Sequence, residues 1–268
     1  DRRLLLDAID GNGYYTNWYL TKDGVQIQSG SWGYAYAYDY MNPVLNLGPG
    51  DYQLRFDGAN SQYSFRMVDL DQVPVVAGSD MSGTVNPGEA LVSRFEAVAG
   101  DSLVYRAVDT GSVSGYWGLV GPSGQTVGTW SNLRQNRIVQ DLAQTGTYYV
   151  VWDTHENYVS PGATYGINLQ HVTPAAPVPL ALNTATTGTL AADGSLSYQF
   201  ETSEATLLWL DALTGDNLNG LNWKIVDSSN VQVASGTYGN QSYSRAVLAS
   251  AGTYTPKFYP PSTGTFSD

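Results

Sequence analysis

The sequence predicts an all-β protein made of tandem antiparallel β-sandwich domains, jelly-roll-like or Ig-like, in an elongated array. Three observations lead to this class. Markers recur in one order about every hundred residues, which indicates internal repeats. Within each unit the apolar residues alternate with a period of two, as in half-buried strands. Turn sequences such as Asp23-Gly24 and Asn219-Gly220 separate these runs, and sustained helical periodicity is absent.

Three markers identify the repeats. Each series begins with a tryptophan, continues with glycine, a hydroxyl residue and an aromatic residue, and ends with Gly-x-Tyr. The markers are Trp18, Trp117 and Trp223; Gly30-Ser31-Trp32, Gly128-Thr129-Trp130 and Gly236-Thr237-Tyr238; and Gly50-Asp51-Tyr52, Gly146-Thr147-Tyr148 and Gly252-Thr253-Tyr254. Each unit of about a hundred residues has room for the roughly seven to nine short strands of an antiparallel sandwich.

The marker spacing predicts three domains: β-sandwich repeat 1 at residues 1–72, repeat 2 at 73–173 and repeat 3 at 174–268. The second linker, 173–180, is proline-rich and is therefore expected to be semi-rigid. Gly83-Thr84-Val85 and Phe95 precede the apolar strand at Leu103 in repeat 2. Counterparts occur in repeat 3 as Gly188-Thr189-Leu190 and Phe200, but repeat 1 has none.

We therefore expect repeat 1 to lack its first strands and to have an open edge beside Leu4-Leu5-Leu6. Repeat 3 is expected to be cut in its last strand. On this interpretation the 268 residues belong to a longer repeat protein. Upstream residues, or a strand donated by a neighbouring copy, would fill the gap in repeat 1.

The Gly-x-Tyr marker predicts a tyrosine corner in each repeat. In this motif the tyrosine ring packs inside the sandwich and its hydroxyl bonds to nearby backbone. Pro256 stands in the strand that follows the third marker. Because proline cannot donate to a ladder, we expect that strand to lie at an edge or to carry a bulge.

Composition excludes several classes of function. The formal net charge is −12 and the pI is near 4.3, which argues against nucleic acid or anionic membrane as a partner. The chain has no cysteine, so disulfides and cysteine-based metal or thiol chemistry are excluded. No apolar stretch is long enough to span a membrane.

The sequence also carries no catalytic motif. It has two histidines, His155 and His171, outside any metal-binding or Ser-His-Asp pattern, and no phosphate-binding loop or nucleophile elbow. We therefore predict no enzyme activity, no catalytic residues and no required cofactor or metal. Calcium remains a possibility, because the segments 7–12 and 211–217 each place two acids and an amide at a strand end. Asx turns that cap a strand are the favoured interpretation of both segments.

An aromatic run is the candidate binding feature. Trp32, Tyr34, Tyr36, Tyr38 and Tyr40 alternate with small or polar residues, so in a strand all five rings would share one face. Trp32 has counterparts in the other repeats and is predicted to be structural. The four tyrosines have none in repeat 2. They either pack in the core or between domains, or form an exposed surface that binds sugar rings or another protein.

The motifs resemble the bacterial pre-peptidase C-terminal domain, whose relatives occur in secreted peptidases and in large bacterial cell-surface repeat proteins. The residues that carry this resemblance are Gly83-Thr84-Val85, Glu89, Phe95, Gly100-Asp101, Leu103, Trp117, Leu119 and Gly146-Thr147-Tyr148. The resemblance implies a jelly-roll-like sandwich in a secreted protein, with calcium or matrix binding in some members. A peptidase module is not present in this chain.

These observations favour a non-enzymatic structural or adhesive segment of a large secreted bacterial surface protein: a stalk, an adhesin arm or a filament. Its partners would be neighbouring repeats of the same chain or copies of itself, with glycan or matrix protein as further possibilities. The alternative is a set of polysaccharide- or matrix-binding accessory modules of a secreted hydrolase, which would bind through Tyr34, Tyr36, Tyr38 and Tyr40. The expected location is extracellular, at the bacterial cell surface.

Overall fold

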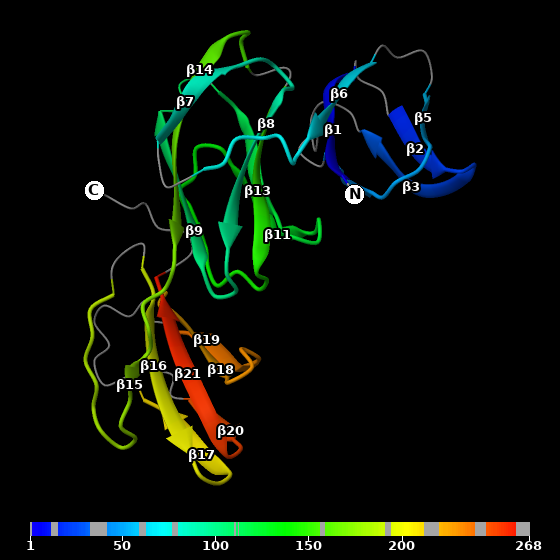
Figure 1. The fold of residues 1–268 in the computed structure, drawn as a ribbon. Coiled ribbons are helices and arrows are strands. Elements are labelled where there is room, and N and C mark those ends of the chain that lie inside the picture. The colour runs from blue at the N-terminus through cyan, green and yellow to red at the C-terminus, as the bar shows by residue number, and fades with distance from the viewer. Residues whose placement is uncertain are drawn as a thin grey trace. The chain divides into compact units, whose positions relative to one another are not determined.

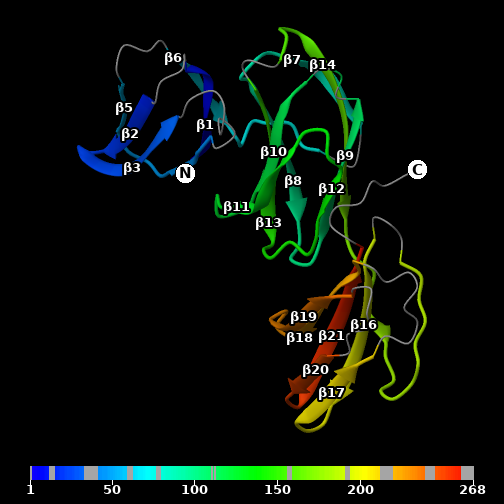
Figure 2. The ribbon, with the colours of Figure 1, turned by 180° about the vertical axis from the view of Figure 1, so that it is seen from behind.

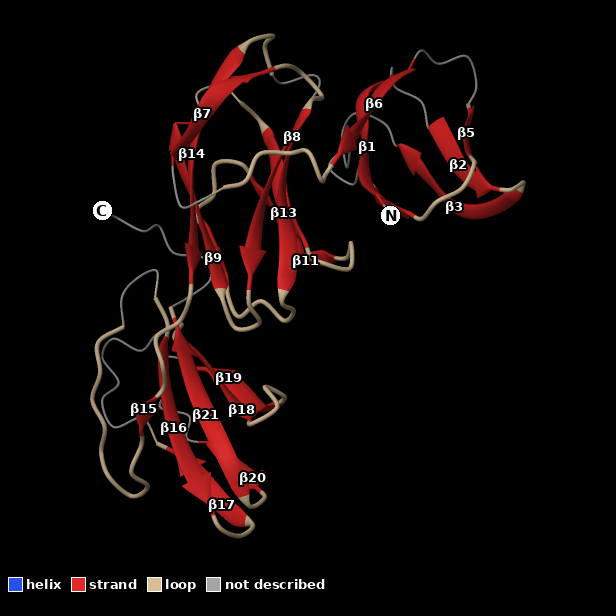
Figure 3. Ribbon diagram, viewed as in Figure 1, coloured by secondary structure: helices blue, strands red, loops and turns tan. Residues whose placement is uncertain are grey.

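A computed structural model describes residues 2–11, 16–32, 42–58, 63–76, 80–109, 111, 113–155, 159–190, 194–211, 220–238 and 245–260. Every regular element among them is a β-strand (Figure 3), which confirms the predicted all-β class for this part of the chain. Contacts divide the chain into two compact units. Unit 1 covers Asp1–Ala99, Leu103–Gln135 and Leu142–His171, and unit 2 covers Gly100–Ser102, Asn136–Asp141 and Val172–Asp268. The division into three repeats stays a prediction.

Unit 1 begins with a pair of three-stranded sheets, here called the first sheet pair, with strand orders β4-β1-β6 and β3-β2-β5 (Figure 1). Its strands are β1 (Arg2–Gly11), β2 (Thr16–Lys22), β3 (Val25–Trp32), β4 (Val44–Leu47), β5 (Tyr52–Asp57) and β6 (Tyr63–Asp69). Leu6 and Leu45 from one sheet are buried with Trp18 and Leu20 from the other. The period-two alternation thus directs one side of each sheet into a shared core.

The second sheet pair has the strand orders β11-β10-β13-β8 and β12-β9-β14-β7 (Figure 2). Its strands are β7 (Asp80–Val85), β8 (Ala90–Ala97), β9 (Ser102–Asp109), β10 (Gly115–Val120), β11 (Thr126–Asn132), β12 (Arg137–Val139), β13 (Gly146–Thr154) and β14 (Ala163–Val172). Tyr105 of β9 stacks on Trp117 of β10 with ring centroids 4.3 Å apart. Both side chains are fully buried, so this stack joins the two sheets.

The third sheet pair lies in unit 2, with strand orders β15-β16-β21-β18-β19 and β17-β20. Its strands are β15 (Val178–Pro179), β16 (Leu196–Thr202), β17 (Thr206–Leu210), β18 (Asn222–Asp227), β19 (Gln232–Thr237), β20 (Arg245–Ala249) and β21 (Gly252–Tyr259). Its core joins Phe200, Trp223 and Tyr254 from the larger sheet to Val247 and Ala249 from the smaller one.

Strand order is the same in the three sheet pairs wherever their strands can be matched in sequence. β4-β1-β6 matches β12-β9-β14, and β3-β2-β5 matches β11-β10-β13. In unit 2, β19-β18-β21-β16 matches β11-β10-β13-β8, and β17-β20 matches β9-β12. Within the described residues, the first sheet pair has no counterpart of β7 or β8.

The prediction that an open edge lies beside Leu4-Leu5-Leu6 is wrong. β1 pairs with β4 through Leu5↔Val44 and with β6 through Leu5↔Val68, so it lies inside its sheet. The reason is that β7 and β8 pair with β14 and β13, and neither pairs with β9, the counterpart of β1. Among the described residues, β5 and β6 therefore lack the outer neighbour that their counterparts β13 and β14 have.

The inward side chains of these two edge strands are less well covered than their counterparts. Leu54, Phe56 and Phe65 are only partly buried against the first core. Val150 and Trp152, on the matching strand β13, are 0% and 3% exposed. An edge strand with half-covered apolar residues is suited to pairing with a further strand.

β1 and β13 are among the strands that are buried on both faces. Leu6 points into the first core, whereas Leu5 belongs to a second buried cluster that contains Tyr149 and Val151 of β13. We call this second cluster the seam; its members are Leu5, Leu70, Val73, Ala90, Val92, Val120, Tyr149 and Val151. The seam packs β1 of the first sheet pair against β8 and β13 of the second, within unit 1.

The predicted tyrosine corners are confirmed at all three positions. Tyr52, Tyr148 and Tyr254 each donate a hydroxyl hydrogen bond to the backbone carbonyl four residues upstream, at 2.8, 2.7 and 3.0 Å. The glycine two residues before each tyrosine has φ between +143° and +154°. Residues with a Cβ rarely adopt this backbone conformation, which explains the glycine of the Gly-x-Tyr marker.

The glycine of the second marker lies under a tryptophan ring in two sheet pairs. Gly30 pairs with Trp18 and Gly236 with Trp223 across neighbouring strands. A Cβ on either glycine would lie 2.7 or 2.8 Å from the indole ring. The recurring Trp and Gly markers are therefore two halves of one contact, in which the ring covers the bare backbone of the adjacent strand.

The expectation for Pro256 is wrong. β21 lies between β16 and β18, and Pro256 pairs with Ile225 of β18 in an unshifted register. On the other side the ladder runs from Ser197↔Lys257 to Phe200↔Tyr254 without a bulge and is interrupted opposite the proline. The missing N–H is thus accommodated inside the sheet by a local break in one ladder.

Replacing Tyr148 by phenylalanine should lower the free energy of unfolding by about 1–2 kcal/mol, because the buried hydroxyl both donates to the Gln144 carbonyl and accepts from the Gln144 N–H. Urea denaturation would measure the loss. Tyr63→Phe is the matched control, since Tyr63 is 44% exposed and its change should stay within about 0.5 kcal/mol. Equal effects of the two substitutions would contradict a stabilising corner.

Candidate functional site

The four candidate binding tyrosines, Tyr34, Tyr36, Tyr38 and Tyr40, lie outside the described residues. Trp32 ends β3 and pairs with Thr16. The binding surface predicted from this run therefore stays a prediction. The described residues contain two other groups of polar side chains that could serve a function, one in each unit.

The first group surrounds Asp7 at the seam. Asp7 lies on β1, and its carboxylate is completely buried. One oxygen accepts from Arg66 Nε at 2.6 Å and from the Ala90 backbone N–H at 3.2 Å. The other accepts from Asn42 Nδ2 at 3.0 Å, and the same amide nitrogen donates to Asp153 at 2.9 Å.

Arg66 connects this carboxylate to the second sheet pair. It stands opposite Asp7 in the β1–β6 ladder. Its guanidinium donates to Glu89 at 2.6 Å and to the Ala90 carbonyl, so one planar side chain joins three acceptors. We call Asp7, Asn42, Arg66, Glu89 and Asp153 the Asp7 cluster. It extends from β1 and β6 to the start of β8 and to β13.

The Asp7 cluster contains the first acid of the candidate calcium segment 7–12. Burial raises the pKa of Asp7, and the hydrogen bond and charge of Arg66 oppose that shift. The carboxylate is thus engaged by an arginine, an amide and a backbone N–H. In the second candidate segment, residues 212–217 lie outside the described part of the chain. Among the described residues, no group of three or more His, Cys, Asp or Glu side chains could hold a metal ion.

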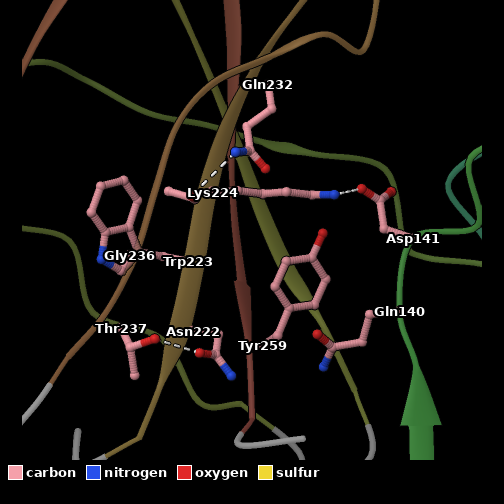
Figure 4. Close-up of a pocket in the computed structure, with 10 residues that line it drawn as sticks. Gln140, Asp141, Asn222, Trp223, Lys224, Gln232, Gly236, Thr237 and Tyr259 are labelled. Carbon is pink, nitrogen blue, oxygen red and sulfur yellow. Dashed lines mark hydrogen bonds and ion pairs between the residues drawn. The ribbon is translucent and has the colours of Figure 1, made fainter. Parts of the chain in front are cut away.

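The second group lines a pocket of ≈ 320 Å³ in unit 2 (Figure 4). The pocket lies over the outer face of β18, β19 and β21, opposite the core side on which Trp223 and Ile225 are buried. Gln140 and Asp141 form the facing wall. The lining residues are Gln140, Asp141, Asn222, Trp223, Lys224, Gln232, Ser235, Gly236, Thr237 and Tyr259.

Two lysines lie side by side at this pocket. Lys224 and Lys257 are cross-strand partners on β18 and β21, and both form ion pairs with Asp141, that of Lys257 at 2.9 Å. Lys257 also donates to Asn230 at 3.3 Å. Burial, together with the positive charge of Lys257, lowers the pKa of Lys224 to about 8. Two ammonium groups thus share one carboxylate.

The pocket also contains polar atoms that lack a partner among the described residues. The hydroxyl of Tyr259 and Nε2 of Gln140 are both buried without a hydrogen bond there. Figure 4 shows the Tyr259 hydroxyl pointing toward the Lys224 side chain and Asp141. Tyr259 is only 5% exposed, and burial raises the pKa of its hydroxyl, so this group stays a donor. The arrangement is rich in donors and can hold an oxygen acceptor.

Sequence reasoning missed both groups. The sequence suggests Asx turns, or less favourably calcium, for the segment that contains Asp7, because its partner Arg66 is distant in sequence. A weak signal for the pocket was available: the chain has three lysines, and two of them alternate with apolar residues in strands on either side of an aromatic marker. Their approach to Asp141 depends on tertiary packing, which no local pattern reveals.

Comparison with known proteins adds little. No family model matches the chain, and no curated protein matches it. Among solved structures, the crystal structure of tripeptidyl peptidase 2 is 10% identical, with a TM-score of 0.25, over 96% of this chain and 27% of that chain. The structure of infectious bursal disease virus Gt strain is 11% identical, with a TM-score of 0.19, over 98% of this chain and 61% of that chain. Likenesses this weak carry no argument.

Among the described residues, no helix is long and apolar enough to cross a membrane.

Replacing Arg66 by methionine should lower the free energy of unfolding by about 2 kcal/mol, because Asp7 would stay buried without its cationic partner. The loss is less than for a fully enclosed pair, since the Arg66 side chain is 35% exposed. Urea denaturation is the measurement. Combining Arg66→Met with Asp7→Asn should recover part of the loss.

Arg55→Met is the matched control. Arg55 pairs with Asp57 and lies 4.8 Å from the centroid of the Tyr19 ring, but the side chains of the ion pair are 63% and 50% exposed, so the change should be at most about 1 kcal/mol. If both arginine substitutions had the same effect, the Asp7 cluster would have no special role in stability.

Proposed function

We propose that this chain is a non-enzymatic structural or adhesive segment of a large secreted bacterial surface protein, acting as a stalk, an adhesin arm or part of a filament. In this proposal the sheet pairs are tandem β-sandwiches in an elongated row outside the cell. Their partners are neighbouring repeats of the same chain or other copies of it.

The observation that carries the proposal is the joint at the seam. Leu5, Tyr149 and Val151 are at most 1% exposed there, and the Asp7 cluster adds charged hydrogen bonds beside them. Flexible linkers between domains typically leave few buried contacts across the boundary. A joint with both an apolar core and a buried ion pair resists bending, which is the property that a stalk needs.

Strand order supports the same proposal. The matching arrangement of β1 with β4 and β6, and of β9 with β12 and β14, is what repetition of one unit would produce. The uncovered edges of β5 and β6 are suited to receiving strands from a neighbouring repeat or copy. Such pairing would extend the row.

Solution scattering tests the proposal. A compact globule of 268 residues has a radius of gyration of about 18 Å. An elongated row should exceed that value by at least about a third. A measured radius near the compact value would rule out a stalk.

The alternative, an accessory module that binds polysaccharide or matrix, is separated from this proposal by a glycan array. Specific binding that is lost in Tyr36→Ala and Tyr38→Ala, and retained in Tyr63→Ala, would favour the alternative. Absence of binding would leave the structural role as the better account.

A further inference from the structure

The pocket of unit 2 presents buried hydrogen-bond donors without a partner, while several of its acceptors are already engaged. Both carboxylate oxygens of Asp141 are engaged by Lys224 and Lys257. The side-chain oxygen of Asn222 accepts from the Thr237 hydroxyl at 2.7 Å. Against these occupied acceptors stand the Tyr259 hydroxyl and the Gln140 amide nitrogen, which have no partner among the described residues.

The charges at the pocket also favour a ligand that accepts hydrogen bonds. Lys224 and Lys257 together carry two positive charges, and Asp141 supplies one negative charge. The side chains are 22%, 13% and 5% exposed, so this excess is held in a partly desolvated place. In a chain with a net charge of −12 and three lysines, two of those lysines meet at Asp141 on the border of this pocket, which makes the place a local exception. This excess charge favours a ligand with an anionic oxygen acceptor.

The rest of the lining suits hydroxyl groups. Asn222, Gln232, Ser235 and Thr237 lie along the floor on β18 and β19, and Tyr259 offers an aromatic face beside Lys224, whose Nζ is 5.7 Å from the ring centroid. A volume of ≈ 320 Å³ is at the lower end for ligand pockets and suits a single sugar ring. We propose that this pocket binds an acidic monosaccharide unit, a uronic acid, with its carboxylate at Lys224 and Tyr259 and its hydroxyls on the polar floor.

The protonation state of the pocket gives a further constraint. Three titratable groups line it, Lys224, Asp141 and Tyr259, and Lys257 lies behind them as the second partner of Asp141. The pKa of Lys224 is lowered to about 8, that of Lys257 is also lowered by burial, and that of Tyr259 is raised. Lysine loses its charge as the pH rises through its pKa, so anion binding is strong below that pH and weakens above it. Raising the pH from about 7 to about 9.5 should therefore weaken uronate binding.

The test is a titration of the full chain with galacturonate, galactose and inorganic phosphate, followed by amide NMR spectroscopy. We expect saturable galacturonate binding with a dissociation constant on the order of 1 mM. Galactose differs only at the carboxylate and should bind at least about 10-fold more weakly. No saturation with galacturonate up to about 20 mM would overturn the proposal. Phosphate binding as tight as galacturonate would show a simple oxyanion site and overturn the sugar assignment.

Two variants and a control locate the site. Lys224→Met should weaken galacturonate binding by at least about 10-fold. Tyr259→Phe should weaken it by about fivefold and leave the melting temperature unchanged or raised, because the hydroxyl has no partner in the free protein. Lys22→Met, at the third lysine, should have no effect. Unchanged affinity in Lys224→Met, or a lowered melting temperature with unchanged affinity in Tyr259→Phe, would refute the site. The inference does not rest on the proposed stalk, and the scattering result bears on it in neither direction.

Discussion

The ion pair between Asp7 and Arg66 is the interaction on which the arrangement of unit 1 depends. Apolar contacts at the seam favour burial but have little directional preference, so Leu5 and Tyr149 alone would allow the sheets to slide. A carboxylate with no exposure must keep its partners, and these partners come from β6, from Asn42 and from the start of β8. The geometry of these charged hydrogen bonds therefore sets how the first sheet pair meets the second.

Local rules were sufficient for the fold class and for the recurring anchors. Alternation with a period of two predicted strands because one face of each sheet must be buried. The tyrosine corners followed from Gly-x-Tyr, since both the glycine conformation and the hydroxyl bond form within five residues. Trp18 and Trp223 are buried in the cores, and their contact with Gly30 and Gly236 explains why the two markers recur together.

Non-local packing accounts for what the sequence did not reveal. Alternation with a period of two predicts one buried face for each strand, yet Tyr149 and Val151 on the other face of β13 are buried at the seam. The uninterrupted apolar run from Tyr148 to Trp152 is the signal for a strand covered on both faces, and the run Leu4-Leu5-Leu6 is its counterpart. Strand register places Lys224 beside Lys257, but their carboxylate partner, Asp141, lies 116 residues before Lys257 in the chain.

Burial of the Asp7 carboxylate also determines how the joint responds to ionic strength. Mobile ions screen charges that face water, as in the Arg2–Asp69 and Arg55–Asp57 pairs, but they cannot enter the space around a carboxylate with no exposure. The apolar part of the seam is, if anything, strengthened by salts that are excluded from protein surfaces. The connection between the first two sheet pairs thus loses less of its strength from dilute to saline surroundings than the exterior ion pairs do.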